Sequence, residues 1–426
     1  MVNPPLHGVK VLDLGDEATA LAARFLAELG AEVVRAEAMT GDRLRRRGPF
    51  VGGRPGLERS LPHLLYNAGK RSLALALDTA DAWELLDRIT TAVDVVIAPL
   101  EKSPLAHRFF AEDRLAAVHP QVGVVDAVFR RDRPEQQVTD LVAVAAGGLL
   151  YCNGFPDRPP ERPAGNLAYK QLSLVACAAA VALIVSRRLE GRGGRAVVGL
   201  QEAVMSTIIQ AANQNLWRWQ GAIARRAGLL GLEYPVLGQG RVALIRSGRT
   251  TYQCQDGLWV SFSIWPPRWG NFLQWLEEVT GSTELMAECW QDPVYRTVHR
   301  DKIEAAVAQL CAALPRDEVV RRGQELGLLV LPVNTVADIA ADPHLEARGF
   351  YRDVWHPALG RHIRLPRSAI RSSAFEAELR PAPRLGEHTR EVLLELAGLT
   401  ETDVAALLER GVAATLAGQE EGEIDP

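Results

Sequence analysis

The 426-residue sequence lacks the features that mark several common classes of protein. Its five cysteines are isolated and form no C-x-x-C pair, which argues against a zinc ribbon, an iron–sulfur site and a disulfide framework. No block of lysine and arginine exceeds three residues and the net charge is only -4, so no nucleic-acid footprint or polybasic membrane patch is visible. The most apolar stretch, 174–185, has 12 residues. A bilayer span needs roughly 20, so we interpret this stretch as part of a buried helix rather than a membrane anchor.

These absences leave a narrower set of functions. An apolar content of 47% and a charged content of 23% are typical of a globular protein with a large core. We therefore expect a cytoplasmic protein that binds a small molecule or another protein, without a metal ion, nucleic acid or membrane as partner.

Strands and helices alternate in the first half of the chain. Such alternation predicts an α/β fold with a doubly wound, Rossmann-like parallel sheet, whose ligands bind at the carboxyl ends of the strands. Apolar runs predict strands at 9–14, 31–37, 71–78, 93–100, 122–129 and 196–201, and helical spacing predicts helices at 18–30, 80–91, 112–119, 170–189 and 202 to about 226.

The first predicted strand-to-helix turn reads Gly15-Asp16-Glu17. The G-x-G-x-x-G phosphate fingerprint is absent, and two acids occupy the place where a pyrophosphate would bind. A dinucleotide cofactor is therefore not expected.

The composition changes after the predicted helix at 202–226. Residues 228–241 form a glycine-spaced segment that we interpret as a loop, and 251–264 alternates around a Gln-Asp-Gly turn like a hairpin. A second, α+β domain is expected here, followed by a helical C-terminal tail. Its helices are predicted at 269–280, 299–313 and 316–326.

Six segments occur in an order and at a spacing that resemble the family III CoA-transferases, which include formyl-CoA and carnitine CoA-transferases and the α-methylacyl-CoA racemases. The segments are PLHGVKVLDL, AELGAEVVRAE, NAGKRSLALALD, LEGRGGRAVVGLQEA, LPVNTVADIAADPHLEARGF and RLGEHTREVLLELAGL. Each alone is a weak signal, whereas all six in register are specific.

The resemblance implies an architecture and an assembly. It implies a large CoA-binding domain begun by 1–200, a linker helix at 201–226, a small domain at 227–330, and a return to the large domain over 331–426. It also implies two protomers threaded through each other as an interlocked homodimer, with a heteromeric partner as the alternative.

The resemblance also implies that the chain binds coenzyme A or acyl-CoA as substrate. The family holds the coenzyme against the loop that contains Asn67, Lys70, Arg71 and Ser72 here, and Arg108 occupies the place of a further CoA-contacting arginine. Lysine and arginine suit phosphate oxygens as a point charge and a bidentate fork. From spacing alone, the loop would be a solvated basic turn and Arg108 a surface residue.

Transferases of this family use an aspartate as the nucleophile that attacks the acyl-CoA thioester. Its place lies 15 residues after the glycine of a G-x-x-D-x-P-P run, here Gly154, and 22 residues before the first glycine of the family's T-G-R-G run, here Gly191. Both counts reach Tyr169, and no Asp or Glu occurs from 162 to 189. The usual anhydride route through this position is therefore closed.

Other residues offer alternative chemistry. Tyr169 at a helix start, beside Lys170, should have a lowered pKa and serve in proton transfer or hydrogen bonding. The racemase base is excluded here, because no histidine occurs between His119 and His299. Asp140 is the most promising substitute carboxylate, although a helix N-cap would also explain it. The other acids near this region are Asp126, Asp132, Glu135, Asp157 and Glu161.

Three hypotheses follow. The chain transfers CoA between an acyl-CoA and a carboxylic acid by a non-standard route, or it carries out acyl-CoA isomerisation, racemisation, hydration or lyase chemistry through Tyr169 and Lys170. The third is a non-catalytic CoA-binding subunit whose chemistry resides in a companion chain.

Overall fold

The computed structural model divides the chain into two compact units. The first combines Met1–Gly147, Ala164–Thr207 and Leu345–Pro426, and the second combines Gly148–Pro163 with Ile208–His344. The second unit therefore extends beyond 227–330 on both sides. The structure describes residues 3–100, 103–130, 139–154, 158–207, 218, 221, 225–226, 232–238, 241–245, 250–264, 266–368 and 370–416.

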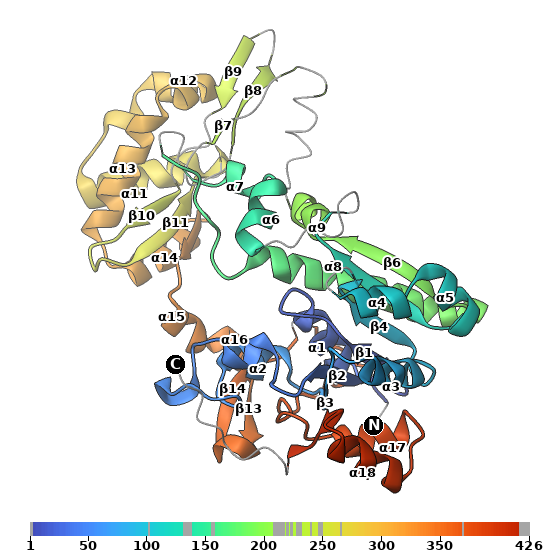
Figure 1. Cartoon of the computed structure of the whole chain (residues 1–426). Helices are drawn as coiled ribbons and strands as arrows, with labels where there is room; N and C mark the ends of the chain where they lie inside the picture. The colour runs from blue at the N-terminus through green and yellow to red at the C-terminus, as the bar shows by residue number, and fades with distance from the viewer. Residues whose placement is uncertain are drawn as a thin grey trace. The chain divides into compact units, whose positions relative to one another are not determined.

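A seven-stranded sheet forms the centre of the first unit (Figure 1). Its order is β15-β3-β2-β1-β4-β5-β6, and all neighbours are parallel except β15, which pairs antiparallel with β3. The order reverses between β1 and β4, as in doubly wound sheets, which confirms the predicted fold class. The strands are β1 (Lys10–Asp13), β2 (Glu32–Ala38), β3 (Arg71–Leu75), β4 (Val95–Ala98), β5 (Gly123–Val128), β6 (Gly194–Gly199) and β15 (Ala413–Ala414).

Helices cover this sheet because its strands are apolar on both faces. Leu12, Val96 and Val124 share one core with Trp83 of α3 and Val392 of α17. Both chain ends thus build the same unit. The helices of this unit are α1 (Ala20–Glu28), α2 (Leu61–Tyr66), α3 (Ala80–Thr90), α4 (Pro104–Phe109), α5 (Glu112–Val118), α6 (Asp140–Ala146), α8 (Leu167–Glu190), α9 (Leu200–Thr207), α17 (Thr389–Glu395) and α18 (Glu401–Glu409). A hairpin of β13 (Tyr351–His356) and β14 (Arg361–Pro366) belongs to it as well.

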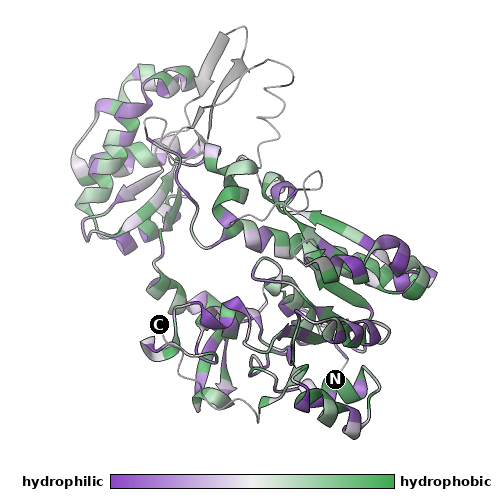
Figure 2. Ribbon diagram, in the orientation of Figure 1, coloured by the Kyte–Doolittle hydropathy of each residue, from purple (hydrophilic) through white to green (hydrophobic). Residues whose placement is uncertain are grey.

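The long helix α8 packs against α1, β4, β5 and β6. Much of its ribbon has a hydrophobic colour in Figure 2, and its length and apolar composition would suffice for a membrane span. Only 28% of its most apolar 18-residue window is buried. The prediction of a buried helix is therefore wrong for one face, where Leu174 and Val185 are 49% and 46% exposed.

The second unit is α+β. Strands β10 (Thr251–Gln253) and β11 (Trp259–Ser263) form the predicted hairpin, and β12 (Leu329–Pro332) pairs antiparallel with β11. Its core buries six aromatic side chains, which are Tyr252, Phe262, Trp269, Phe272, Trp275 and Trp290. Its helices are α7 (Leu149–Cys152), α11 (Trp269–Thr280), α12 (Pro293–Val298), α13 (Arg300–Ala313), α14 (Arg316–Glu325) and α15 (Val336–Ala340), with α16 (Pro343–Ala347) at the boundary.

Two local predictions are wrong. The segment 228–241 contains a strand rather than only loop, because β8 (Leu232–Gly238) pairs antiparallel with β9 (Arg241–Ile245) and with the short β7 (Arg225–Arg226). The antiparallel pairing of β8 with β9 outweighs the strand-breaking effect of the glycines. Likewise the helix expected over 202–226 does not reach its predicted end, since β7 occupies 225–226.

Candidate functional site

The loop after β1 begins the candidate site, because it lies where the strand order reverses. The Gly15 N–H donates to Asp13 Oδ1 at 2.9 Å, and the Ala18 N–H donates to Asp16 Oδ1 at 2.9 Å. A Cβ at Gly15 would lie 2.0 Å from the Thr19 Oγ1, so only glycine fits this turn. The loop N–H groups of Gly15 and Ala18 thus already serve carboxylates of the chain.

Lys70 lies inside the protein. Its side chain has 0% exposure, and Nζ donates to Asp13 Oδ2 at 2.8 Å, to the Asn67 Oδ1 at 2.9 Å and to the Ala20 carbonyl at 3.0 Å. All three ammonium protons are therefore used by the protein. The carboxylate of Asp13 also meets the Arg35 guanidinium at 3.2 Å.

The charges around Asp13 favour its ionised form. Burial alone would raise the pKa of Asp13, but the Lys70 ammonium and the Arg35 guanidinium outweigh that effect and hold the pKa below its usual value. The result is a buried ion cluster that ties the loop after β1 to the loop before β3.

The other predicted coenzyme ligands lie in different surroundings. Asn67 is 1% exposed and bonds the His63 ring at 3.0 Å, and Ser72 is fully buried and donates to Glu37 Oε1 at 2.7 Å. Arg71 is partly exposed and pairs with Glu32 and Glu395, at 2.5 Å and 2.8 Å. Arg108, in α4, is exposed, with its guanidinium 6.0 Å from the centroid of the adjacent Phe109 ring.

Tyr169 is the third residue of α8, after Asn166, which adopts the left-handed conformation with φ 51°. Its backbone N–H donates to Asp140 Oδ1 at 3.3 Å. Asp140 is only 3% exposed and begins α6, whose N-cap is Thr139. The alternative explanation of Asp140 as an N-cap is therefore wrong for α6, and its carboxylate instead meets the N-terminal turn of α8.

The Tyr169 side chain lies in a narrow crevice. Among the residues that line this crevice, Glu17 carries the carboxylate. Glu17 Oε1 accepts from Asn166 Nδ2 at 2.8 Å and also pairs with Arg47. The lining residues are Glu17, Leu21, Tyr66, Asn166, Tyr169, Lys170 and Ser173.

The expectation of a lowered pKa at Tyr169 is wrong. Burial raises the pKa of the phenol above 10.0, and the negative charges of Asp16, Glu17 and Asp140 raise it further. A helix dipole and one neighbouring lysine are too weak to offset burial together with three carboxylates. Tyr169 is therefore a hydrogen-bond donor at neutral pH.

Two further buried charges form ion pairs within the protein. Asp126 is buried within β5 and pairs with Arg195. Arg45 is fully buried between Glu37 and Glu58, at 2.8 Å and 2.9 Å. Asp132, Glu135 and Asp157 lie outside the described residues. Among the described residues, no group of three His, Cys, Asp or Glu side chains is placed to hold a metal ion.

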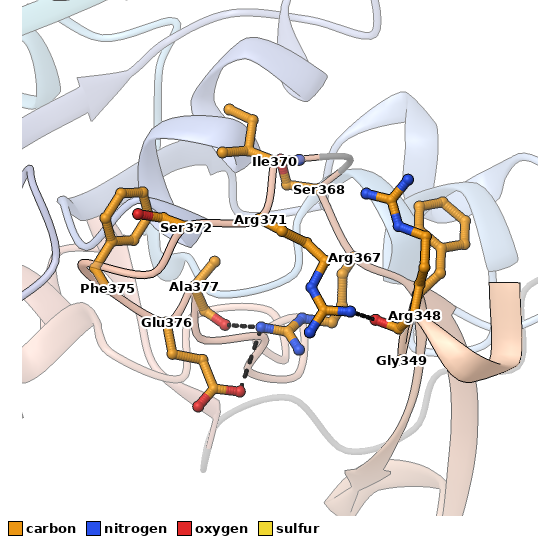
Figure 3. Close-up of a pocket in the computed structure, with 11 residues that line it drawn as sticks. Arg348, Gly349, Arg367, Ser368, Ile370, Arg371, Ser372, Phe375, Glu376 and Ala377 are labelled. Atoms are coloured by element: carbon orange, nitrogen blue, oxygen red, sulfur yellow. Dashed lines mark hydrogen bonds and ion pairs between the residues drawn. The ribbon is translucent and has the colours of Figure 1, made fainter. Parts of the chain in front are cut away.

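A separate cavity of about 250 Å³ lies in the first unit between the segments 348–350 and 367–377 (Figure 3). Arg367 donates to the Ala377 carbonyl at 2.8 Å, and Arg371 donates to the Arg348 carbonyl at 2.5 Å. These bonds fix two of the three arginines that line the cavity. No motif in the sequence pointed to this cavity.

Asp13, Tyr66 and Asn166 were not predicted as parts of the site, and Glu17 was predicted only as an acid that argues against a pyrophosphate. The position of Asp13 and Glu17 at the carboxyl end of the first predicted strand was the signal that could have found them.

A parallel sheet with this order of strands, and a site at its reversal point, define an α/β protein of the doubly wound class. The model of the family described as CoA-transferase family III matches residues 6–389, so the chain belongs to this family. It is 29% identical to the succinyl-CoA:(R)-benzylsuccinate CoA-transferase subunit BbsE of Thauera aromatica, over 94% of this chain and 96% of that protein. It is 26% identical to a formyl-CoA:oxalate CoA-transferase of Escherichia coli, over 95% and 99%. A crystal structure of a CaiB/BaiF family protein from Brucella suis has a TM-score of 0.76 at 24% identity, covering 92% of this chain and 100% of that one.

Proposed function

We propose that this protein binds acyl-CoA and transfers CoA between an acyl-CoA thioester and a carboxylic acid, by a route that does not use a carboxylate at position 169. The observation that carries the proposal is the phenol of Tyr169 at the start of α8, with its pKa above 10.0. A protonated phenol does not form the acyl anhydride through which a carboxylate carries the substrate. It can instead donate a hydrogen bond to the thioester carbonyl as negative charge develops there.

Glu17 is the strongest candidate for the missing carboxylate. It lines the same crevice as Tyr169, and its side chain is 23% exposed, whereas Asp140 is 3% exposed and already accepts the Tyr169 N–H. A nucleophile has to reach the substrate, so the more exposed carboxylate is favoured. The crevice must widen before a thioester can enter.

In the proposed steps through Glu17, each bond that forms replaces one that breaks. Its carboxylate attacks the thioester carbonyl and releases CoA thiolate, giving a mixed anhydride. The thiolate then attacks the glutamyl carbonyl, which gives a glutamyl thioester and frees the first acid. The acceptor acid then attacks the glutamyl thioester and releases CoA thiolate, which gives a second mixed anhydride. The thiolate attacks the acceptor's carbonyl in this anhydride, which regenerates Glu17 and forms the new acyl-CoA.

The coenzyme contacts divide into two roles. Arg108 is exposed and available for a phosphate, and Arg71 is partly exposed, with 18% of its side chain accessible. Lys70, Asn67 and Ser72 are buried, so we assign them to positioning the loop beside the coenzyme rather than to direct contact. No metal ion takes part in the proposed steps.

We also propose that the exposed apolar face of α8 is covered by a second chain, in the cytoplasm. Leu174, Val185 and Leu189 are 49%, 46% and 80% exposed, which is costly to leave in water. An interlocked homodimer is the assembly implied by the family. A heteromer is the second candidate, in which this chain binds the coenzyme and a companion supplies the carboxylate, because the similar Thauera protein is named as a subunit.

Trapping tests the proposal directly. The protein is incubated with an acyl-CoA, a carboxylic acid and borohydride or hydroxylamine, and the adduct is located by mass spectrometry. An adduct at Glu17 that disappears in Glu17→Gln, together with CoA transfer, supports the proposal. Exchange of the α-proton with deuterated solvent without transfer would instead support an isomerase that uses Tyr169 and Lys170. CoA binding without either reaction, and transfer gained by Tyr169→Asp, would support the companion-subunit function.

A further inference from the structure

A second cavity, of about 260 Å³, lies entirely within the second unit. Its walls come from the hairpin strands β10 and β11 and from α11, α12 and α13. The volume is slightly below the range of about 300–1,000 Å³ that is typical of drug-sized ligand sites, so a smaller ligand is indicated. The lining includes Tyr252, Phe262, Trp269, Arg296, Arg300 and Ile303.

The floor of this cavity is apolar and aromatic. Tyr252, Phe262 and Val307 are each 2% exposed, and Trp269 is 7% exposed. Aromatic walls of this kind suit a flat ring or a branched aliphatic group, which they contact through faces and edges. A strongly hydrated ion without an apolar body would gain little here.

Among the described residues that line the cavity, the charged side chains leave one positive charge in excess. Arg300 Nε pairs with Glu304 Oε1 at 3.3 Å, so these two groups compensate each other. The Arg296 guanidinium lies 4.8 Å from the centroid of the Trp269 ring, and among the described residues it has no carboxylate within ion-pair distance. Arginine stays charged at all relevant pH values, so the excess is permanent.

Trp269 adds a buried polar group. Its indole Nε1–H is buried and has no hydrogen-bond partner among the residues that the structure describes. Such a donor is costly to leave unsatisfied, and Arg296 lies against the same ring. A carboxylate drawn to Arg296 would bring an acceptor beside this indole.

We propose that the cavity binds a small monocarboxylate with an aromatic or branched apolar body. One carboxylate matches the single excess charge, and the ring or branched group matches the walls of Tyr252, Phe262 and Val307. The proposal goes beyond CoA transfer and does not depend on it, because every lining residue belongs to the second unit.

Calorimetric titration of the full chain, without acyl-CoA, tests the proposal. The probes are phenylacetate and cyclohexanecarboxylate, with phenylacetamide as the neutral analogue. We expect both acids to bind and the amide to bind at least about 10-fold more weakly, because it lacks the charge that pairs with arginine. Absence of binding by the acids up to millimolar concentration, or equal binding of the amide, overturns the proposal.

Substitutions at the cavity test whether the binding measured by calorimetry takes place there. Arg296→Gln should weaken binding of phenylacetate about 10- to 100-fold, the range for a hydrogen bond to a charged group. Ile303→Phe should weaken it by filling the cavity. The matched control is Arg321→Gln, since Arg321 is an exposed arginine of the same unit that pairs with Glu325 at 2.7 Å on α14. Unchanged binding in Arg296→Gln and Ile303→Phe, with the fold confirmed by circular dichroism, or equal loss in Arg321→Gln, refutes the site.

Discussion

Replacement of Lys70 by methionine separates a structural role of this lysine from a direct role in binding coenzyme phosphate. Nζ of Lys70 is fully buried and donates three bonds of 2.8 to 3.0 Å, one of them to the buried carboxylate of Asp13. Removal of one partner from a buried pair costs about 3–5 kcal/mol. Because Arg35 stays 3.2 Å from Asp13 and compensates part of its charge, we expect a loss near the lower end, about 3 kcal/mol.

The assay is a double-mutant cycle of Lys70→Met, Asp13→Asn and the double variant, followed by urea unfolding. Hydrogen exchange at the β1 amides assigns the loss to the first unit. The double variant should lose less than the sum of the single variants, because each single variant leaves a buried partner unpaired. Lys302→Met is the control, since Lys302 forms an exposed pair with Glu284 and should change stability little.

The pH dependence of stability gives an independent check. The folded pKa of Asp13 lies below its reference value of 3.8, so the stabilisation is complete above that pH and is lost as the pH falls through the folded pKa. This acid-side loss should shrink in Asp13→Asn. A stability loss under about 1 kcal/mol in Lys70→Met, with CoA affinity reduced more than about 10-fold, would refute the buried ion pair and make Lys70 a direct ligand.

Three further predictions concern the site and the assembly. Arg108→Gln should weaken CoA binding in calorimetry by about 10-fold without changing the free energy of unfolding, because Arg108 is exposed, and unchanged affinity would remove it from the coenzyme site. The ultraviolet difference titration of wild type against Tyr169→Phe should show the extra phenol ionising with a midpoint above that of an ordinary tyrosine, because its pKa is raised, and ionisation near neutrality would contradict the site electrostatics. Leu174→Asp and Val185→Asp should lower the molecular mass in sedimentation, since each places a charge on the apolar face of α8, and an unchanged mass would exclude this face as an interface.

The elements of the first unit could be predicted because burial on both faces gives its strands continuous apolar runs. VKVLDL and VGVVDAVF coincide with β1 and β5, and helix α3 lies within one residue of its predicted range. The segment around β8 and β9 could not be predicted in the same way. Its glycines indicate a loop as strongly as its alternating residues indicate strands, and only the pairing of the two strands decides between them.

The candidate site was less accessible to sequence reasoning, since its key contacts join distant residues. The sequence shows that Lys70 is a cation, yet its partner Asp13 lies 57 positions earlier, and nothing local indicates that the ammonium is buried. Counting residues from Gly154 and Gly191 identified position 169, whereas the direction of the Tyr169 pKa shift could not be predicted from the sequence. Glu17, which raises it, comes from a loop 149 positions from Asn166, and folding alone brings the two together.

The antiparallel edge strand β15 determines when the first unit can finish folding during synthesis on the ribosome. It pairs Ala413 with Leu75 of β3, and Val392 and Val404 complete the core beneath the sheet. Until β15 has emerged, β3 keeps an open edge and an uncovered apolar surface, the kind of surface that chaperones bind. The continuous stretch 208–344 of the second unit emerges well before that. The nascent chain should therefore finish folding its second unit before its first unit.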